Sequence, residues 1–161
     1  MFRKALRGSM RLRSTSEAQS SYPNCFEKIE NDVFHFVFDN TKIRNAISTD
    51  LLNFIEAAAN RCHAHDQIKA MVIYASSPIA FSSGANLKER RAMTLDQALE
   101  AQNSVRRVFN LLSKVPVPTF SLIDGHCIGE GLEIALATDF RIVAKSAKLS
   151  FPETRLGLIP G

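Results

Sequence analysis

The sequence has only three cysteines, and none of them forms a CxxC pair: Cys25, Cys62 and Cys127. This argues against a disulfide framework or a zinc site and favours a reducing compartment, so we expect no bound metal. No apolar run approaches the ~18 residues of a membrane-spanning helix. Internal repeats and low-complexity segments are also missing, and 161 residues allow one domain at most. These absences leave an ordinary globular domain, in agreement with an apolar fraction of 45%.

Acidic residues are almost absent from the N-terminus. Residues 1–20 carry several basic side chains against Glu17 alone, and this segment accounts for the whole formal net charge of +4. Because the rest of the chain is neutral, the charge gives no support to nucleic-acid binding. A basic, serine-bearing start without the apolar core of a secretory signal is typical of a mitochondrial transit peptide. We predict such a peptide over residues 1–21 and a domain over residues 22–161; a disordered basic tail is the alternative.

Apolar periodicity predicts strands and helices in alternation, which is typical of an α/β layered domain. The continuous apolar run at residues 70–75 is the pattern of a strand buried on both faces, as in a parallel sheet. Thr94 and Gln97 have the spacing of a capping box, which predicts the start of a long helix. The other expected strands are 26–30, 33–39, 119–123 and 140–144, with a brief extended piece at 149–151 and turns at Asn31-Asp32 and Asp124-Gly125. The other expected helices run from Ser48 or Thr49 to about His63 and over residues 129–138.

A glycine-bearing loop is expected over residues 76–88, directly after the buried strand. It therefore lies at the carboxyl end of a strand, where open α/β sheets bind ligands. Gly84 permits a left-handed turn or a close backbone approach, so the N–H of Ala85 could point into a cleft. Three basic side chains beyond it could meet phosphates: Lys88, Arg90 and Arg91. The alternative is an ordinary loop with a solvated basic face.

The last third of the chain places two carboxylates near a glycine turn. The turn Gly129-Glu130-Gly131 opens an apolar helix, whose free N–H groups can stabilise an anion. Glu133 lies in the first turn of that helix, where a carboxylate among apolar neighbours must be paired, protonated or functional. Glu153 follows Pro152 in a loop. The alternatives are a capping glutamate that faces water and a surface glutamate that pairs with Arg155.

Together these motifs resemble the enoyl-CoA hydratase/isomerase (crotonase) family. The resemblance rests on F-x-x-G-A-x-L-K at 81–88, on D-G-x-x-x-G-x-G-L-E-I-A-L-A-x-D-F-R-I at 124–142 and on the closing FPETRLGLIPG. Asn45-Ala46 also resembles the start of the family's first helix. The resemblance begins near Phe26 and is strongest toward the mitochondrial methylglutaconyl-CoA hydratase-like members. It implies an α/β crotonase-like fold of layered β-α units, of which this chain supplies the N-terminal part.

The resemblance also implies a role for the residues of these motifs. The backbone N–H groups of Ala85 and Glu130 would form an oxyanion hole for a thioester carbonyl. Glu133 and Glu153 would be the catalytic acid–base pair that adds water to a 2-enoyl-CoA. The residues implied in coenzyme A and substrate binding are Ser83, Ala85, Asn86, Leu87 and Lys88. Coenzyme A would be part of the substrate, so no separate cofactor is expected.

The family further implies a setting and an assembly. The leading interpretation is an enoyl-CoA hydratase of fatty-acid β-oxidation or branched-chain amino-acid breakdown in the mitochondrial matrix. Its substrate would be an acyl-CoA thioester, its assembly a homo-oligomer (trimer or hexamer), and no membrane partner is expected. RNA binding, the third interpretation, is not favoured, because the expected first long helix, residues 50–65, carries only Arg61 as a strong base.

Two residues depart from the family pattern. Glu130 stands where the family usually has the middle glycine of a Gly-Gly-Gly turn. Its side chain would be strained if the position needs a positive φ, and its charge could repel a developing oxyanion. Asn86 stands where aspartate is usual, which is a mild exchange. The family domain also continues beyond Gly161 with part of the acyl pocket. An isomerase, and a catalytically inactive fragment with exposed apolar surface, are therefore the alternatives.

Overall fold

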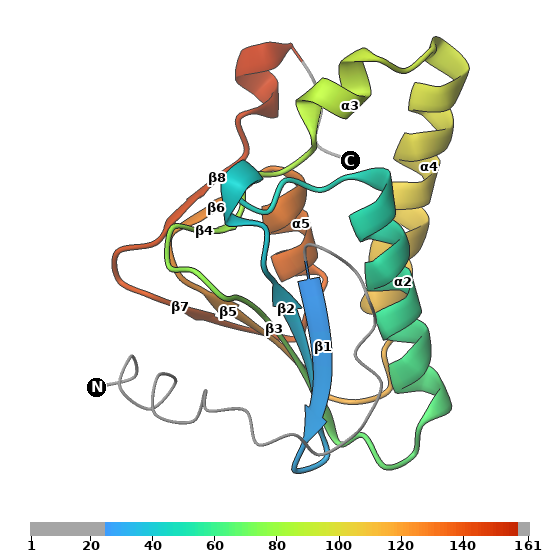
Figure 1. The fold of residues 1–161 in the computed structure, drawn as a ribbon, viewed down its shortest axis with the longest axis vertical. Helices are drawn as coiled ribbons and strands as arrows, with labels where there is room; N and C mark the ends of the chain where they lie inside the picture. The colour runs from blue at the N-terminus through green and yellow to red at the C-terminus, as the bar shows by residue number, and fades with distance from the viewer. Residues whose placement is uncertain (1–24, 158–161) are drawn as a thin grey trace.

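The structure, a computed structural model, describes residues 25–157 as two β-sheets with α-helices packed against them (Figure 1). The α/β layering predicted from the sequence is confirmed. The segment predicted as a transit peptide, residues 1–21, lies outside the described residues and stays a prediction. The helices are α2 (Thr49–Ala64), α3 (Leu87–Arg91), α4 (Leu95–Leu112) and α5 (Glu130–Leu136), with two short 3₁₀ helices, η1 (Thr41–Ile43) and η2 (Glu153–Leu156).

The larger sheet has the strand order β1-β2-β3-β5-β7. The first two strands pair antiparallel, and every other neighbouring pair is parallel. Parallel pairing requires crossover connections, which α2 and α4 supply. The strands are β1 (Cys25–Glu30), β2 (Val33–Phe38), β3 (Ala70–Ala75), β5 (Thr119–Ile123) and β7 (Phe140–Val143). All five were expected from the sequence to within one residue at each end.

The antiparallel pair at the edge of this sheet is joined by a tight turn. Asn31 and Asp32 adopt φ values of 54° and 63° between the paired residues Glu30 and Val33. A two-residue hairpin turn with positive φ at both central positions matches the twist of the flanking strands, and Asn and Asp tolerate that conformation. The turn dipeptide read from the sequence therefore sets the register of β1 against β2.

A second sheet of three short parallel strands was not expected. It has the order β4-β6-β8, with β4 (Ala80–Ser82), β6 (His126–Ile128) and β8 (Lys148–Ser150). The sequence predicted a loop over residues 76–88, and this is wrong for the buried strand β4. Three residues are too few to show an alternating pattern, and all three side chains of β4 are buried, so there was no polar face to detect. Pairing of β4 with β6 brings the segments that follow these two strands together.

Helices α2 and α4 begin where the sequence predicts, whereas α3 was not predicted and starts within the expected loop 76–88. The Ser48 side chain accepts a hydrogen bond from the Leu51 N–H (3.2 Å) at the start of α2. At the start of α4 the Thr94 N–H donates to Gln97 Oε1 (2.9 Å), and the Gln97 N–H donates to Thr94 Oγ1 (3.3 Å). The capping box is therefore confirmed. Figure 1 shows α2 and α4 side by side, with α5 between them and the smaller sheet.

The core lies between these helices and the larger sheet. The expected apolar stripe of α2 is buried in full: Leu51, Leu52, Ile55, Ala58, Ala59 and Cys62. It packs against aromatic side chains of β2, of which Phe36 lies 5.2 Å from Phe54 between ring centroids. All three cysteines are buried free thiols, and burial raises the pKa of each to about 12. They are therefore core residues rather than reactive thiols.

The far edge of the larger sheet is apolar and open to solvent. Every residue of β7 is exposed, and Phe140 is 54% exposed although its ring stacks on that of Phe120 at 5.0 Å. Leu136 and Leu149 are exposed large apolar side chains on neighbouring elements. Edge strands of this kind are usually paired or covered in a complete domain.

Asn45 ties the start of α2 to the smaller sheet. It is 2% exposed, and its Nδ2 donates to the carbonyls of Ala80 (2.9 Å) and Phe81 (3.1 Å). Its Oδ1 accepts from the Asn40 N–H (2.8 Å), and its backbone carbonyl accepts from Ser82 Oγ (2.7 Å). The position has a φ of 55°, which asparagine tolerates better than most residues. The Asn-Ala dipeptide noted in the sequence is thus a structural anchor for β4.

We expect Asn45→Ala to lower the free energy of unfolding by about 2–4 kcal/mol, because buried carbonyls and an N–H lose their partners. Denaturant unfolding measures this. The matched control is Asn53→Ala on the exposed face of α2, which should change stability by less than about 0.5 kcal/mol. Equal small effects of the two substitutions would show that the hydrogen bonds of Asn45 contribute little.

Candidate active site

The two segments that leave β4 and β6 lie against each other. Gly84, just after β4, has a φ of 86°, and a Cβ atom built on it would lie 2.8 Å from the Ile128 carbonyl oxygen and 3.5 Å from the Glu130 nitrogen. A backbone can approach another this closely, in the left-handed region, only at glycine. Gly84 therefore places the backbone of Ala85 beside the turn at Gly129-Glu130.

The N–H of Ala85 is directed away from Ile47, its neighbour on the other side. Ile47 forms an isolated parallel bridge with Ala85, in which the Ile47 N–H donates to the Gly84 carbonyl (2.8 Å) and the Asn86 N–H donates to the Ile47 carbonyl (2.9 Å). In a parallel bridge the central residue directs its own N–H to the opposite side. Among residues 25–157, no acceptor is hydrogen-bonded to the backbone N–H of Ala85 or Glu130. Two donors are therefore available on adjacent segments.

In the turn before α5, the residue with a positive φ is Gly129 and not Glu130. Gly129 has φ 50° and ψ −126°, whereas Glu130 is the first helical residue and has no positive φ. The possible strain raised by a side chain at position 130 is thus excluded. Gly131, the third position of the turn, packs against Ser82, since a Cβ there would lie 2.6 Å from Ser82 Cβ. The substitution at Glu130 leaves the backbone of the turn unchanged.

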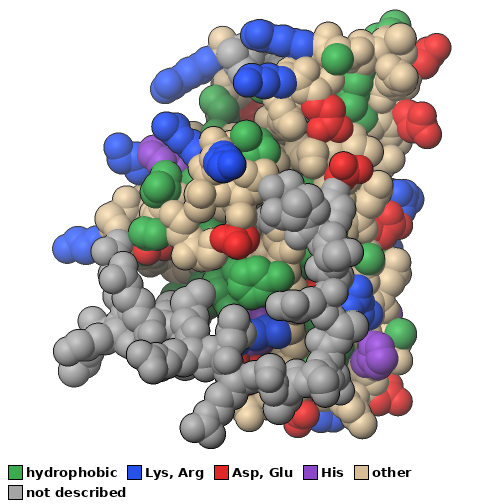
Figure 2. Space-filling view, viewed as in Figure 1, with side chains coloured by type: hydrophobic (Ala, Val, Ile, Leu, Met, Phe, Trp, Pro, Cys, Tyr) green, Lys and Arg blue, Asp and Glu red, His purple; other side chains and the backbone are tan. Residues whose placement is uncertain are grey.

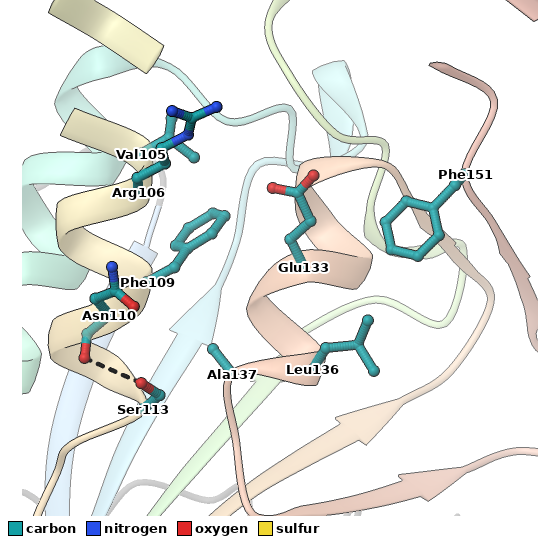
Figure 3. Close-up of a pocket in the computed structure, with 9 residues that line it drawn as sticks. All are labelled: Val105, Arg106, Phe109, Asn110, Ser113, Glu133, Leu136, Ala137 and Phe151. Atoms are coloured by element: carbon teal, nitrogen blue, oxygen red, sulfur yellow. Dashed lines mark hydrogen bonds between the residues drawn. The ribbon is translucent and has the colours of Figure 1, made fainter. Parts of the chain in front are cut away.

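Glu133 lines a cleft between α4 and α5 and is not simply a capping residue that faces water. The cleft has a volume of about 480 Å³, and Figure 3 shows the Glu133 side chain extending from α5 into the space between α4 and Phe151. The remaining lining residues are Val105, Arg106, Phe109, Asn110, Ser113, Leu136 and Ala137. The sequence assigned Phe109 to the core face of α4; it is half-buried and forms part of this cleft.

Glu153 lies at the glycine turn that precedes α5. It is the first residue of η2, and a Cβ atom on Gly129 would overlap its Oε1, so the carboxylate lies directly against the glycine turn. Its Oε2 is buried and has no hydrogen-bond partner among the described residues. Arg155 is exposed and forms no ion pair with Glu153 in that part of the chain, so the surface-pair alternative does not hold.

The Glu130 side chain is a third carboxyl group near this turn. It is 12% exposed, and its Oε1 lies 2.8 Å from an Nη atom of Arg90 on α3. Burial raises the pKa of Glu130 from 4.5 to about 7; Arg90 opposes the rise, and the nearby charges of Glu133 and Glu153 add to it. Glu130 and Glu133 are three residues apart on α5 and Glu153 lies against Gly129, so the three carboxyl groups are close together. The Arg90–Glu130 pair was not predicted.

The raised pKa of Glu130 makes stability depend on pH. The folded protein holds this proton more tightly than the unfolded chain, so stability should fall as the pH rises from about 4.5 to about 7. The corresponding difference is on the order of 3 kcal/mol. Glu130→Gln cannot ionise and should show a flatter profile in urea unfolding between about pH 5 and about pH 7.5. Parallel profiles for the two proteins would contradict the raised pKa.

The residues implied in coenzyme A binding form one continuous segment after β4. Ser83 donates through Oγ to the Ile43 carbonyl (3.3 Å), and Asn86 caps α3 by accepting from the Glu89 N–H (3.4 Å). Leu87 is 53% exposed and Lys88 is exposed. Figure 2 shows Lys and Arg side chains gathered at the upper left, around η2 and the smaller sheet, where an anionic group would be favoured.

Two other kinds of site were sought within residues 25–157. No three His, Cys, Asp or Glu side chains in this range are grouped as ligands for a metal ion. No helix in this range has both the length and the apolar character that crossing a bilayer demands.

Comparisons with known proteins agree with the motifs. The family profile of enoyl-CoA hydratase/isomerase matches residues 28–161. The mitochondrial methylglutaconyl-CoA hydratase of Mus musculus is 38% identical over 118 residues, which cover 73% of this chain and 38% of the relative. An enoyl-CoA isomerase/hydratase of Mycosarcoma maydis is 37% identical over 137 residues, covering 80% of this chain and 50% of the relative. The chain thus spans half or less of the length of these relatives.

The fold has a close counterpart among solved structures. An enoyl-CoA hydratase from Bacillus anthracis matches with a TM-score of 0.82 and 29% sequence identity, covering 86% of this chain and 54% of that one. This confirms the crotonase-like fold predicted from the sequence. The described residues correspond to the first part of that longer fold, as the resemblance implied.

Proposed function

Because the chain belongs to the enoyl-CoA hydratase/isomerase family, we propose that it adds water to the double bond of a 2-enoyl-CoA thioester. One observation supports the proposal: Glu153 lies against the glycine turn and Glu133 is in the first turn of α5, close to the N–H groups of Ala85 and Glu130, which no described residue accepts. These groups come from segments far apart in the sequence. Their meeting at the ends of β4 and β6 would supply an oxyanion site and two acid–base groups together.

The two N–H groups would stabilise the charge that develops on the thioester oxygen. When water adds to C3 of an enoyl thioester, the electrons of the double bond move toward the carbonyl oxygen and form an enolate. Donors already fixed by the backbone need no reorganisation at that moment, and each contributes about 2.7–4 kcal/mol in comparable sites. Gly84 fixes the position of Ala85, and Gly129 fixes that of Glu130.

The two glutamates would handle the protons. As the water oxygen bonds to C3, one carboxylate takes the proton that the water loses, and a carboxyl group delivers a proton to C2. Positioned acid–base groups typically contribute a factor of about 10²–10⁴. The buried Oε2 of Glu153 has no partner among the described residues and is therefore available to hold the attacking water.

The cleft beside Glu133 would take the acyl group. Its volume of about 480 Å³ is within the range of small-molecule sites, and its walls include apolar side chains: Val105, Phe109, Leu136 and Phe151. Coenzyme A would extend from there along Ser83 to Lys88, as a part of the substrate and not as a cofactor. The residues that line this cleft do not by themselves specify the acyl group.

Isomerisation is the second candidate, supported by the name of the Mycosarcoma maydis relative, an enoyl-CoA isomerase/hydratase. Moving a double bond requires one carboxylate that carries a proton between two carbons. The presence of two carboxylates, Glu133 and Glu153, near the turn supports hydration. The two reactions leave different products, so mass spectrometry of the product separates them: hydration adds the mass of water and isomerisation adds nothing.

The direct test is the loss of enoyl-thioester absorbance when purified protein is mixed with crotonyl-CoA. Saturable loss, with a 3-hydroxyacyl-CoA as product, is expected. No loss with short and branched 2-enoyl-CoA substrates would reject the hydratase and support the inactive alternative.

A mitochondrial location is part of the proposal. It is supported by the name of the methylglutaconyl-CoA hydratase from Mus musculus and by the basic N-terminal segment. Matrix location, a role in β-oxidation or amino-acid breakdown, and a trimeric or hexameric assembly follow only from the family resemblance. Residues 1–21 fused to a fluorescent protein should direct it to mitochondria; a diffuse signal would reject the transit peptide.

A further inference from the structure

Glu130 carries two groups with opposite effects on the proposed reaction. Its backbone N–H is one of the two proposed oxyanion donors, while its side chain carries a carboxyl group on the same residue. A carboxylate free to turn toward the thioester oxygen would repel the enolate that the N–H is meant to stabilise. At this buried site, with two further carboxylates close by, the repulsion would be little screened by solvent.

In the structure, Arg90 pairs with the Glu130 carboxylate. The residue lies on α3, the helix that follows Ala85 and Asn86, and its guanidinium reaches across to Glu130 Oε1 at 2.8 Å. Both side chains are largely buried, at 23% and 12% exposure, so the pair is a fixed contact and not a passing surface one. Its neighbours Lys88 and Arg91 are exposed, so Arg90 alone among the basic residues of α3 turns inward.

We infer that Arg90 is a positioning residue that holds the Glu130 carboxylate away from the thioester oxygen and cancels its charge, so that the Glu130 N–H can act as an oxyanion donor. The inference rests on the proposed function. Arg90 itself touches neither substrate nor reacting atoms in this account. It acts through Glu130, and its effect depends on the charge of that one side chain.

The charge of Glu130 is open to change near neutral pH, which gives the inference a distinctive signature. The groups that face it are Arg90 from α3, Glu133 from α5 and Glu153 from η2, and burial raises its pKa to about 7. Without Arg90 the pKa of Glu130 should rise further, since the one group that opposes the rise is gone. The side chain would then be neutral and harmless at low pH, and charged and inhibitory at high pH.

The experiment compares wild type, Arg90→Met, Glu130→Gly and the double variant between about pH 6 and about pH 9. Arg90→Met should lower kcat for crotonyl-CoA hydration at least 10-fold at the upper end and much less at the lower end. Glu130→Gly removes the charge, so in that background Arg90→Met should change kcat by less than 3-fold at either end of the pH range. Adding Glu130→Gly to Arg90→Met should restore most of the lost activity. Arg107→Met, which breaks the exposed Arg107–Glu56 pair, is the control and should change nothing.

A second readout is independent of catalysis. The carboxyl carbon of Glu130, labelled with ¹³C and followed by NMR, should titrate near pH 7 in the wild type and at higher pH in Arg90→Met. An unshifted midpoint, or a loss of activity that is equal at all pH values and not rescued by Glu130→Gly, would overturn the inference. If the wild type shows no hydration, the proposed function fails, whereas the NMR midpoint still decides whether Arg90 sets the charge of Glu130.

Discussion

Replacing Glu133 or Glu153 by glutamine should lower the rate of hydration of a 2-enoyl-CoA by a factor of about 10²–10⁴. Glutamine keeps the shape and hydrogen-bonding capacity of each side chain but cannot take up or release a proton. The Glu153 carboxylate lies against the glycine turn and Glu133 lines the adjoining cleft, away from the segment proposed to bind coenzyme A, so the loss should appear in kcat and not in binding of the thioester. Initial rates with crotonyl-CoA and equilibrium binding of a saturated acyl-CoA measure the two separately.

Stability should distinguish this result from simple unfolding. The Glu153 carboxylate is half-buried, and its Oε2 has no partner among the described residues, so removing its charge should leave the free energy of unfolding unchanged or higher. Glu100→Gln, on the exposed surface of α4, is the matched control and should alter neither rate nor stability. Full activity in both Glu133→Gln and Glu153→Gln would show that the acid–base roles are misassigned.

Gly84→Ala should have the second large effect, because it acts on the oxyanion donors without touching a catalytic side chain. The new Cβ would meet the Ile128 carbonyl oxygen at 2.8 Å, and the φ of 86° is strained for alanine. The segment carrying Ala85 must then move away from Glu130. Loss of one aligned donor corresponds to a fall in kcat of about 10²–10³, and overpacking costs stability by about 1–3 kcal/mol.

Gly157→Ala separates strain from displacement. Gly157 has a similar φ of 71°, but nothing lies within 4 Å of a Cβ built there. It should therefore show the cost in stability of a left-handed alanine, about 1–2 kcal/mol, with hydration retained. If Gly84→Ala and Gly157→Ala lowered kcat equally, the close approach at Gly84 would have no special role in the reaction.

The sequence predicted the strands of the larger sheet well, for physical reasons. The run at 70–75 is apolar throughout, and β3 does lie between two parallel neighbours, but the expected burial of both faces is only partly met: Met71 and Ile73 are buried, whereas Val72 and Tyr74 are half-buried. The turn residues Asn31 and Asp32 adopt the positive φ values that a two-residue hairpin turn requires. Capping residues identified the starts of α2 and α4, since a side chain that bonds a backbone N–H is a local signal. Such features depend on neighbours in the sequence and can be recognised without the fold.

The parts that the sequence missed depend on distant contacts. Strand β4 is held in place by pairing with β6 and by hydrogen bonds from Asn45. A segment of three residues is too short for such contacts to appear as a sequence pattern. The pairing of Arg90 with Glu130 spans 40 positions, so no helical spacing revealed it. A weak signal was present: an acid that departs from the family turn, with an arginine just after the other half of the proposed oxyanion hole, where it was expected only as a possible phosphate contact.

The central claim is that this chain's two glutamates, beside the N–H groups of Ala85 and Glu130, add water to an enoyl thioester. The most direct test is to incubate the protein with crotonyl-CoA in ¹⁸O-labelled water and analyse the product by mass spectrometry. The account predicts 3-hydroxybutyryl-CoA that carries one ¹⁸O at C3, formed by the wild type and at least 100-fold more slowly by Glu133→Gln and Glu153→Gln. Unlabelled or absent product from the wild type, or equal labelling by all three proteins, would contradict it.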